Sequence, residues 1–162
     1  MVKRKRVCVI GAGVSGLASA QAFRDRGHDV TVLERSHDLG GVWEPSRSYP
    51  GIKTQSPKDL YRYVGMAMPD DYPEWPSGRQ VYEYLRAFAT AKGLLPLIRF
   101  GHAVRAMARR KGGGWRLDVE NGQGETREED FDFVVAATGV FSEKNVLTHP
   151  GQDGFEYAGG TV

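Results

Sequence analysis

The sequence predicts an α/β fold in which a parallel sheet carries an inserted, antiparallel, three-stranded meander. Short β-branched runs at Val7–Ile10 and Val30–Leu33 flank a segment of helical pattern at Val14–Arg26. Continuous apolar runs are typical of buried parallel strands, and a helix between two of them makes a βαβ unit. A third apolar run, Phe131–Ala137, predicts another parallel strand. The length of 162 residues suits one domain.

The middle of the chain predicts a long loop region followed by one helix and one short strand. Residues 36–68 are rich in glycine and proline, and residues 69–78 carry three more prolines. We expect Ser77 to cap a helix that Gly93 ends, because apolar residues follow at helical spacing: Val81, Leu85 and Phe88. A strand near Ile98–Phe100 comes next.

Three polar-apolar segments then predict the inserted meander. They are Ala103–Ala108, Trp115–Glu120 and a weaker strand at Glu125–Glu128, separated by glycine-rich breaks at residues 112–114 and 121–122. The tail from Ser142 to Val162 shows little periodicity.

Composition excludes several function classes. The net charge is only +2, without the concentrated basic face that is typical of a nucleic-acid partner. No apolar stretch is long enough to span a bilayer, and the N-terminus lacks a signal-peptide core, so we expect a cytoplasmic protein. The single cysteine, Cys8, is expected to be a buried strand thiol. The four histidines and this cysteine lack metal-ligand spacing, so we predict no metal site.

A glycine motif between the first strand and the first helix carries the clearest chemistry. Gly11, Gly13 and Gly16 form G-x-G-x-x-G: the first permits a tight turn, the second lets a pyrophosphate approach, and the third allows close helix packing. The helix N-terminus at Val14 and Ser15 attracts phosphate charge. Glu34, at the end of the second strand, is placed to accept hydrogen bonds from a ribose. This spacing predicts a Rossmann-type dinucleotide site.

Two later stretches are similar to those of flavoproteins that bind two dinucleotides, and they favour FAD over NAD. Glu34–Arg35 is followed by Gly40-Gly41-Val42-Trp43, and the third apolar run ends in Ala137-Thr138-Gly139. In those proteins the corresponding segments pass close to the flavin cofactor. A buried strand that ends in a glycine turn also lets backbone approach a ligand.

A series of segments narrows the resemblance to the flavin-containing monooxygenases, which are related to the Baeyer–Villiger monooxygenases. The segments cover nearly the whole chain in order: Gly40–Trp43, Thr54–Lys58, Met68–Pro73, Tyr82–Leu85, the meander with Trp115, and Pro150–Gly151 with Phe155. The resemblance implies an enzyme in which NADPH reduces FAD, and a C4a-(hydro)peroxyflavin transfers oxygen from O2 to a nitrogen or sulfur nucleophile or to a ketone.

The resemblance also implies which residues hold the cofactor. Besides the glycines, Glu34 and Arg35, they are Val14, Ser15, Gly40, Gly41, Val42, Trp43, Thr54, Val104 (at the adenine end), Ala137, Thr138 and Gly139. Where the family usually has Asn near the flavin ring, this chain has Gln55. Gln55 is therefore a candidate for a catalytic contact with the flavin or the peroxide, and the alternative is a loop residue without a catalytic role.

The second dinucleotide motif of the family, which binds NADPH, has no counterpart in these residues. A family stretch of Phe-x-Gly type that leads to a His breaks off after Phe155 and Gly159-Gly160. We therefore expect residues 1–162 to be one FAD-binding domain that stops before the NADPH domain. Two alternatives remain, namely a non-catalytic FAD- or nucleotide-binding module, and another oxidoreductase of the two-dinucleotide class. The sequence indicates neither the substrate nor the oligomeric state.

Overall fold

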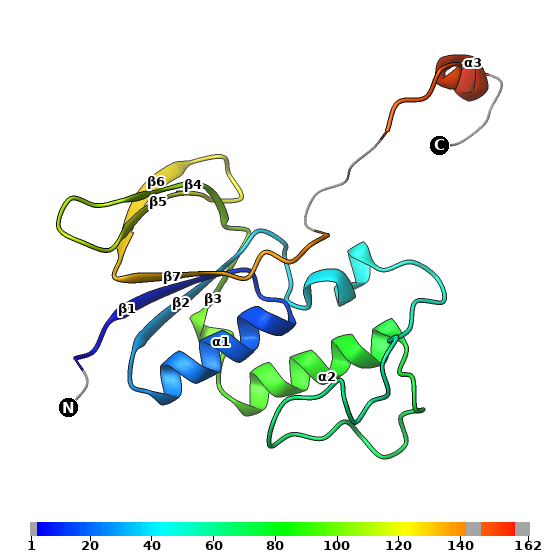
Figure 1. Cartoon of the computed structure of the whole chain (residues 1–162), viewed down its shortest axis with the longest axis horizontal. Coiled ribbons are helices and arrows are strands. Elements are labelled where there is room, and N and C mark those ends of the chain that lie inside the picture. Colours follow the sequence, from blue (N-terminus) through cyan, green and yellow to red (C-terminus); the bar gives the residue numbers. More distant parts are fainter. Residues whose placement is uncertain (1–2, 142–146, 158–162) are drawn as a thin grey trace.

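A four-stranded parallel sheet forms the centre of the chain (Figure 1). The structure is a computed structural model that describes residues 3–141 and 147–157. The strands are β1 (Arg6–Ile10), β2 (Asp29–Glu34), β3 (Ile98–Phe100) and β7 (Phe133–Ala136), in the spatial order β3-β2-β1-β7. Every neighbouring pair is parallel, so the carboxyl ends of all four strands meet at one edge of the sheet.

Two helices cover one face of this sheet (Figure 1). The helix α1 (Val14–Asp25) connects β1 to β2, which confirms the predicted βαβ unit. The helix α2 (Gly78–Ala91) begins at a capping box in which Ser77 and Gln80 satisfy each other's backbone N–H groups. It packs on the core through buried apolar residues at helical spacing, namely Val81, Leu85 and Phe88.

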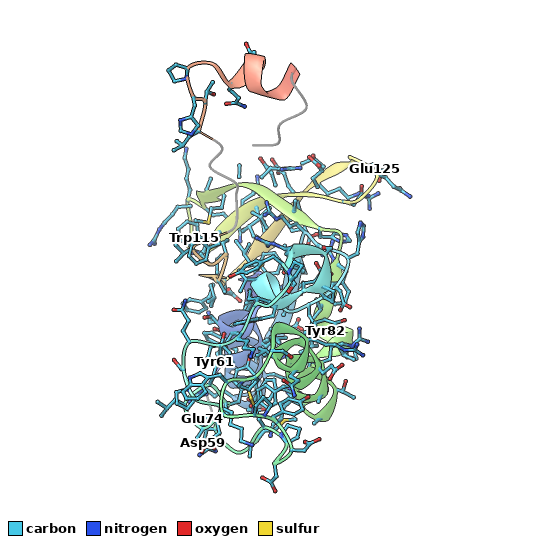
Figure 2. The ribbon with its side chains drawn as sticks, turned by 90° about the vertical axis from the view of Figure 1, so that its right-hand side faces the viewer. Asp59, Tyr61, Glu74, Tyr82, Trp115 and Glu125 are labelled. Carbon is cyan, nitrogen blue, oxygen red and sulfur yellow. The ribbon has the colours of Figure 1, made fainter. Side chains whose placement is uncertain are left out.

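The predicted meander covers the opposite face. It consists of β4 (Ala103–Arg109), β5 (Trp115–Glu120) and β6 (Thr126–Phe131), paired antiparallel in chain order. Its buried side chains pack against the parallel sheet in a second core made by Cys8, Leu33, Leu117, Val119 and Phe131. Figure 2 shows Trp115 and Glu125 on the meander, at a distance from Tyr61 and Tyr82 on the helical side.

The prediction of one strand over Phe131–Ala137 is wrong at its start. Phe131 ends β6, where it pairs with Trp115, and β7 begins only at Phe133. Asp132 makes the corner between them, because its N–H donates to the Arg6 carbonyl and its carboxylate accepts from the Arg6 N–H. The apolar run in the sequence therefore continues across a corner at which the chain passes from the antiparallel sheet into the parallel sheet.

The loop region between β2 and α2 is fixed to the core by aromatic rings and one lysine. It includes the short 3-10 helices η1 (Gly41–Trp43) and η2 (Pro45–Arg47); a third, η3 (Leu95–Leu97), precedes β3. The Lys58 ammonium donates to three backbone carbonyls, those of Pro69, Asp70 and Tyr72, at 2.7–3.2 Å. These three bonds tie the two halves of the loop region together.

The aromatic residues of this region pack against the core and the helices. Tyr63 stacks on Phe88 with ring centroids 3.7 Å apart, and its hydroxyl donates to the Val14 carbonyl at the start of α1. The Tyr84 hydroxyl donates to the Met66 carbonyl and accepts from the Tyr63 N–H. Tyrosine hydroxyls therefore connect the loop region to both helices.

The C-terminal part contains one element that the sequence did not indicate. A short helix, α3 (Gln152–Tyr157), follows Pro150-Gly151, and Figure 1 places it away from the two sheets. The Gly159-Gly160 pair lies outside the described residues. Over residues 3–141 and 147–157, no helix has the length and apolar character needed to cross a bilayer.

Candidate functional site

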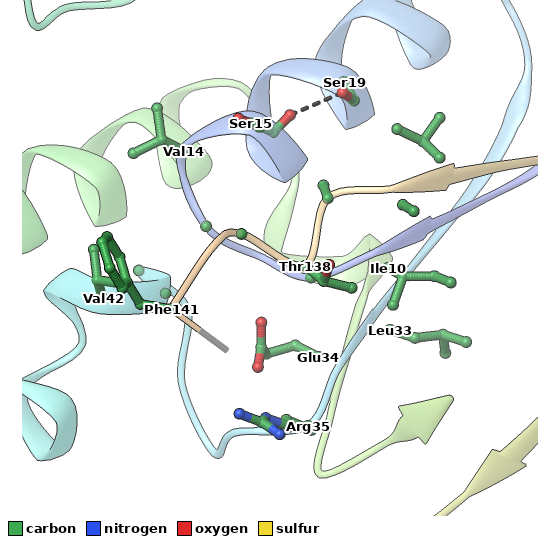
Figure 3. A pocket seen from close by; sticks show the side chains of 18 of the residues that line it. Ile10, Val14, Ser15, Ser19, Leu33, Glu34, Arg35, Val42, Thr138 and Phe141 are labelled. Atoms are coloured by element: carbon green, nitrogen blue, oxygen red, sulfur yellow. Dashed lines mark hydrogen bonds between the residues drawn. The ribbon is translucent and has the colours of Figure 1, made fainter. Parts of the chain in front are cut away.

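A pocket of about 600 Å³ opens at the carboxyl ends of β1, β2 and β7 (Figure 3). Ligands of open α/β sheets bind at this edge of the sheet. The pocket is bounded by the glycine loop after β1, by Glu34 and Arg35 at the end of β2, and by residues 135–141 around the end of β7. The remaining walls come from η1 with Arg47, from Tyr61, and from residues 102–105.

The glycine loop can adopt its course only without side chains at two positions. At Gly11 the φ angle is +102°, and a Cβ would lie 2.6 Å from the Ala137 carbonyl oxygen. At Gly16 a Cβ would lie 1.9 Å from the Gly11 carbonyl oxygen, well inside van der Waals contact. Gly11 and Gly16 therefore let β1, β7 and α1 approach one another, as the motif predicts.

Gly13 has a different role, because a side chain there would meet no such obstacle. It lines the pocket at the start of α1, and its nearest neighbour is Gly41, whose Cα lies 3.6 Å from an added Cβ. Gly41 itself has φ +61° and would place a Cβ 3.2 Å from the Gly13 Cα. Two bare backbone segments thus face each other beside the free N–H groups of α1, which is the environment that a phosphate requires.

Glu34 both lines the pocket and holds the glycine loop in place. Its side chain is buried, with 7% exposed. One carboxylate oxygen accepts from the Ala12 N–H at 2.7 Å, and the other accepts from the Ser36 N–H at 2.8 Å. Each carboxylate oxygen retains a second acceptor position. Glu34 can therefore accept a further hydrogen bond from a ligand hydroxyl while it keeps the loop fixed.

Hydrogen bonds between neighbouring segments of the lining show the order in which these segments follow one another along the pocket. The order starts at residues 102–105. The His102 N–H donates to the Glu34 carbonyl at 2.9 Å, so Val104 lies at the Glu34 end. From Glu34 the wall continues through the glycine loop, where the Gly40 N–H donates to the Ala12 carbonyl at 3.0 Å. It then reaches Trp43, which is buried and borders Tyr61.

The structure brings together most of the residues that the sequence singled out. The pocket is lined by Gly11, Gly13, Val14, Ser15, Glu34, Arg35, Gly40, Gly41, Val42, Trp43, Val104, Ala137, Thr138 and Gly139. Gly16 lies beneath the loop and does not line the pocket. Neither Thr54 nor Gln55 lines it: Thr54 is buried with a hydroxyl that has no partner among the described residues, and Gln55 is exposed.

Several lining residues were not predicted. Arg47 donates to the Phe141 carbonyl at 2.6 Å and so connects η2 to the segment after β7. Ser19 lies one turn into α1, and its hydroxyl donates to the Ser15 carbonyl at 2.8 Å (Figure 3). Tyr61 also lines the pocket, beside Trp43. The helical position of Ser19 was a usable signal, whereas no pattern in the sequence connects Arg47 to residue 141.

The lining is suited to holding a dinucleotide, and the described residues supply neither a cluster of metal ligands nor a reactive thiol. In the described part of the chain, no group of three or more His, Cys, Asp or Glu side chains is placed to hold a metal ion. Cys8 is buried in β1, and burial raises the pKa of its thiol to about 12, so it is not a nucleophile at neutral pH. The bare glycine backbone and the acceptor of Glu34 match the phosphates and ribose of FAD.

Comparison with known proteins decides the family. The model of the flavin-binding monooxygenase-like family matches residues 4–158. The chain belongs to this family. This confirms the resemblance that the sequence motifs indicated. A rat relative, dimethylaniline monooxygenase [N-oxide-forming] 4, is 36% identical over 149 residues, which are 85% of this chain and 26% of the relative.

Solved structures agree with this assignment. S-allyl-L-cysteine S-oxygenase from Allium sativum superposes with a TM-score of 0.80 at 25% identity, over 93% of this chain and 40% of that one. A steroid monooxygenase bound to NADP gives a TM-score of 0.74 at 27% identity, over 93% of this chain and 29% of that one. The chain thus spans well under half the length of these relatives.

Proposed function

We propose that this chain is the FAD-binding part of an NADPH-dependent flavoprotein monooxygenase. The observation that carries the proposal is the pair of bare backbones at Gly13 and Gly41, which face each other beside the N-terminus of α1 and next to the Glu34 carboxylate. This combination supplies N–H donors and a positive helix end for a pyrophosphate, and an acceptor for a ribose hydroxyl.

Each part of the lining has a task in holding FAD. The Gly11–Ser15 segment receives the pyrophosphate, Glu34 accepts from the ribose, and the backbone at Val104 contacts the adenine end. Gly40–Trp43 and Ala137–Gly139 close over the rest of the cofactor, with Arg35 at the rim. When bound, the flavin supplies the redox and oxygen-transfer chemistry, and the protein orients it and excludes water.

The activity of the whole protein extends the proposal beyond these residues. A solved relative carries NADP, and a structure named OTEMO, with a TM-score of 0.76 at 25% identity, carries FAD and NADP. We propose NADPH as the hydride donor, O2 as the co-substrate, and a small nitrogen or sulfur nucleophile or a ketone as the substrate. The cytoplasm stays our prediction for the compartment.

A contact of Gln55 or Thr54 with the cofactor has less structural support than the contacts above. Neither lines the pocket, and the Thr54 hydroxyl is enclosed by protein. A flavin contact from Gln55 therefore requires the exposed amide to turn toward the cofactor. Substituting Gln55 by Asn restores the side chain usual in the family, and by Ala removes the amide. A catalytic role predicts that only Gln55→Ala slows substrate oxygenation.

A non-catalytic FAD-binding module is the competing function. The two are separated in the whole protein of which we propose this chain to be the FAD-binding part, by measuring NADPH consumption and O2 uptake in its FAD-loaded state with a tertiary amine, a thioether and a cyclic ketone. A monooxygenase consumes both in step with oxygenated product. A module that binds FAD tightly but consumes neither, with any of the three substrates, would contradict the enzymatic part of the proposal and leave its binding part intact.

A further inference from the structure

Tyr61 lines the pocket beside Trp43, whose indole N–H bonds to the Tyr61 hydroxyl. The residue is half-buried, and its ring meets Trp43 edge-on at a centroid distance of 5.8 Å. Its backbone N–H donates to the carbonyls of Pro57 and Lys58 at 3.1 and 3.2 Å. Because Lys58 is itself bonded to three carbonyls, the segment that carries Tyr61 is well fixed.

The direction of the hydrogen bond between Trp43 and Tyr61 is unambiguous. The indole N–H of Trp43 lies 2.8 Å from the Tyr61 oxygen, and an indole nitrogen can only donate. The Tyr61 oxygen is therefore the acceptor, and its own proton is left for another partner. Burial raises the pKa of Tyr61 although the Trp43 bond lowers it, so the hydroxyl keeps that proton at neutral pH.

Neighbouring tyrosines use their protons within the protein. The hydroxyls of Tyr63 and Tyr84 donate to backbone carbonyls, and the Tyr82 hydroxyl donates to the Asp38 carboxylate at 2.5 Å. Within residues 3–141 and 147–157, the Tyr61 hydroxyl has no corresponding acceptor, and it is the one of these four tyrosines that lines the pocket. A half-buried donor beside a ligand pocket is the arrangement expected of a group that bonds to the ligand.

The order of the lining indicates which part of a dinucleotide would reach Tyr61. The ribose belongs at Glu34 and the pyrophosphate at the glycine loop, as proposed above. The remaining half of FAD then continues past Gly41 and Trp43. That half carries the ribityl hydroxyls, the ring carbonyls and the unprotonated ring nitrogens, each of which can accept a hydrogen bond from a hydroxyl. We propose that the Tyr61 hydroxyl, oriented by the Trp43 indole, donates a hydrogen bond to the flavin half of bound FAD.

This inference rests on the proposed function, and its test separates the two. FAD is titrated into wild type, Tyr61→Phe and Tyr49→Phe, and both the dissociation constant and the visible absorption spectrum of the bound flavin are recorded. Tyr49 is 66% exposed and serves as the matched control for loss of a tyrosine hydroxyl. Loss of one neutral hydrogen bond predicts FAD binding about 2- to 12-fold weaker in Tyr61→Phe. We also expect a shifted flavin spectrum, and no change in Tyr49→Phe.

A purely structural role for Tyr61 gives a different result. Tyr61→Phe removes the acceptor of the buried Trp43 N–H, so the melting temperature without FAD falls whichever account is right. If only that temperature changes, while affinity and spectrum equal those of wild type, the inference is overturned. If wild type itself binds no FAD, the proposed function fails, whereas normal binding by wild type with an unaffected Tyr61→Phe removes only the inference.

Discussion

Gly13→Ala should separate cofactor binding from folding. The φ angle of Gly13 is −80°, which alanine adopts freely, and an added Cβ meets its nearest atom at 3.6 Å, in ordinary contact. Gly13 is the N-cap residue of α1, where alanine is less favourable by about 0.5–1 kcal/mol. Alanine also lowers the conformational entropy of the unfolded chain, which stabilises the fold by about 0.4–1 kcal/mol. The free energy of unfolding without FAD should therefore change by less than about 1 kcal/mol.

The same methyl group is added to the pocket lining beside Gly41 and the start of α1, where the account places the pyrophosphate. Forcing an extra methyl into a close-packed contact costs about 1–3 kcal/mol, which corresponds to FAD binding about 5- to 150-fold weaker. The assay combines FAD titration with thermal unfolding of the protein without FAD, in which the melting temperature should move by no more than about 4 °C.

Two further variants control this experiment. Gly112→Ala lies in the exposed β4–β5 hairpin, where no atom of the described residues comes within 4 Å of an added Cβ, so it should change neither property. Gly16→Ala places a Cβ 1.9 Å from the Gly11 carbonyl oxygen, so it should disrupt the fold itself. Wild-type FAD affinity in well-folded Gly13→Ala would refute the assignment of the glycine loop as the phosphate site.

Three other perturbations test the fold and the site. Glu34→Gln leaves one oxygen to accept from the N–H groups of Ala12 and Ser36, so an unpaired N–H should cost about 1–3 kcal/mol of unfolding free energy in denaturant titrations without FAD. Lys58→Met removes three bonds to carbonyls, and proteolysis between residues 57 and 75 should become faster while the spectroscopic helix content is kept. Burial raises the pKa of Cys8 from 9.0 to about 12, so the stability that the buried neutral thiol contributes is complete below pH 9 and is lost as the pH rises toward 12. In Cys8→Ala, the free energy of unfolding should not show this decrease between pH 9 and 12. Labelling of the native thiol with a disulfide reagent at pH 8 should also be slow until the protein unfolds.

The sequence predicted the parts of the fold that local pattern determines. The strands β1 and β2, both helices that cover the sheet, and the three meander strands were expected within one to three residues of their observed bounds. Each has a clear apolar period or a clear stop signal, such as the capping box at Ser77. The exception was Phe131, because apolar side chains on either side of the Asp132 corner serve two sheets and produce one continuous run.

The residues of the candidate site likewise fall into those that could be predicted from the sequence and those that could not. Gly11, Gly13 and Glu34 were predicted because the backbone geometry of a phosphate loop allows few alternatives, and Gly41 was expected from the resemblance to flavoproteins. Tyr61 and Arg47 were not predicted as lining residues, since their positions depend on how a loop of more than thirty residues folds back over the core. That path is set by contacts between distant segments, such as Lys58 with residues 69–72, and no local pattern reports them.

The central claim, that this pocket binds FAD, is tested most directly by the flavin content of the purified protein. The protein is denatured, the released cofactor is identified, and the apoprotein is titrated with FAD and, for comparison, with NAD⁺. The account predicts near-stoichiometric FAD, a structured visible spectrum in the bound state, and no comparable binding of NAD⁺. A folded protein that contains no flavin and takes up none from excess FAD would contradict it.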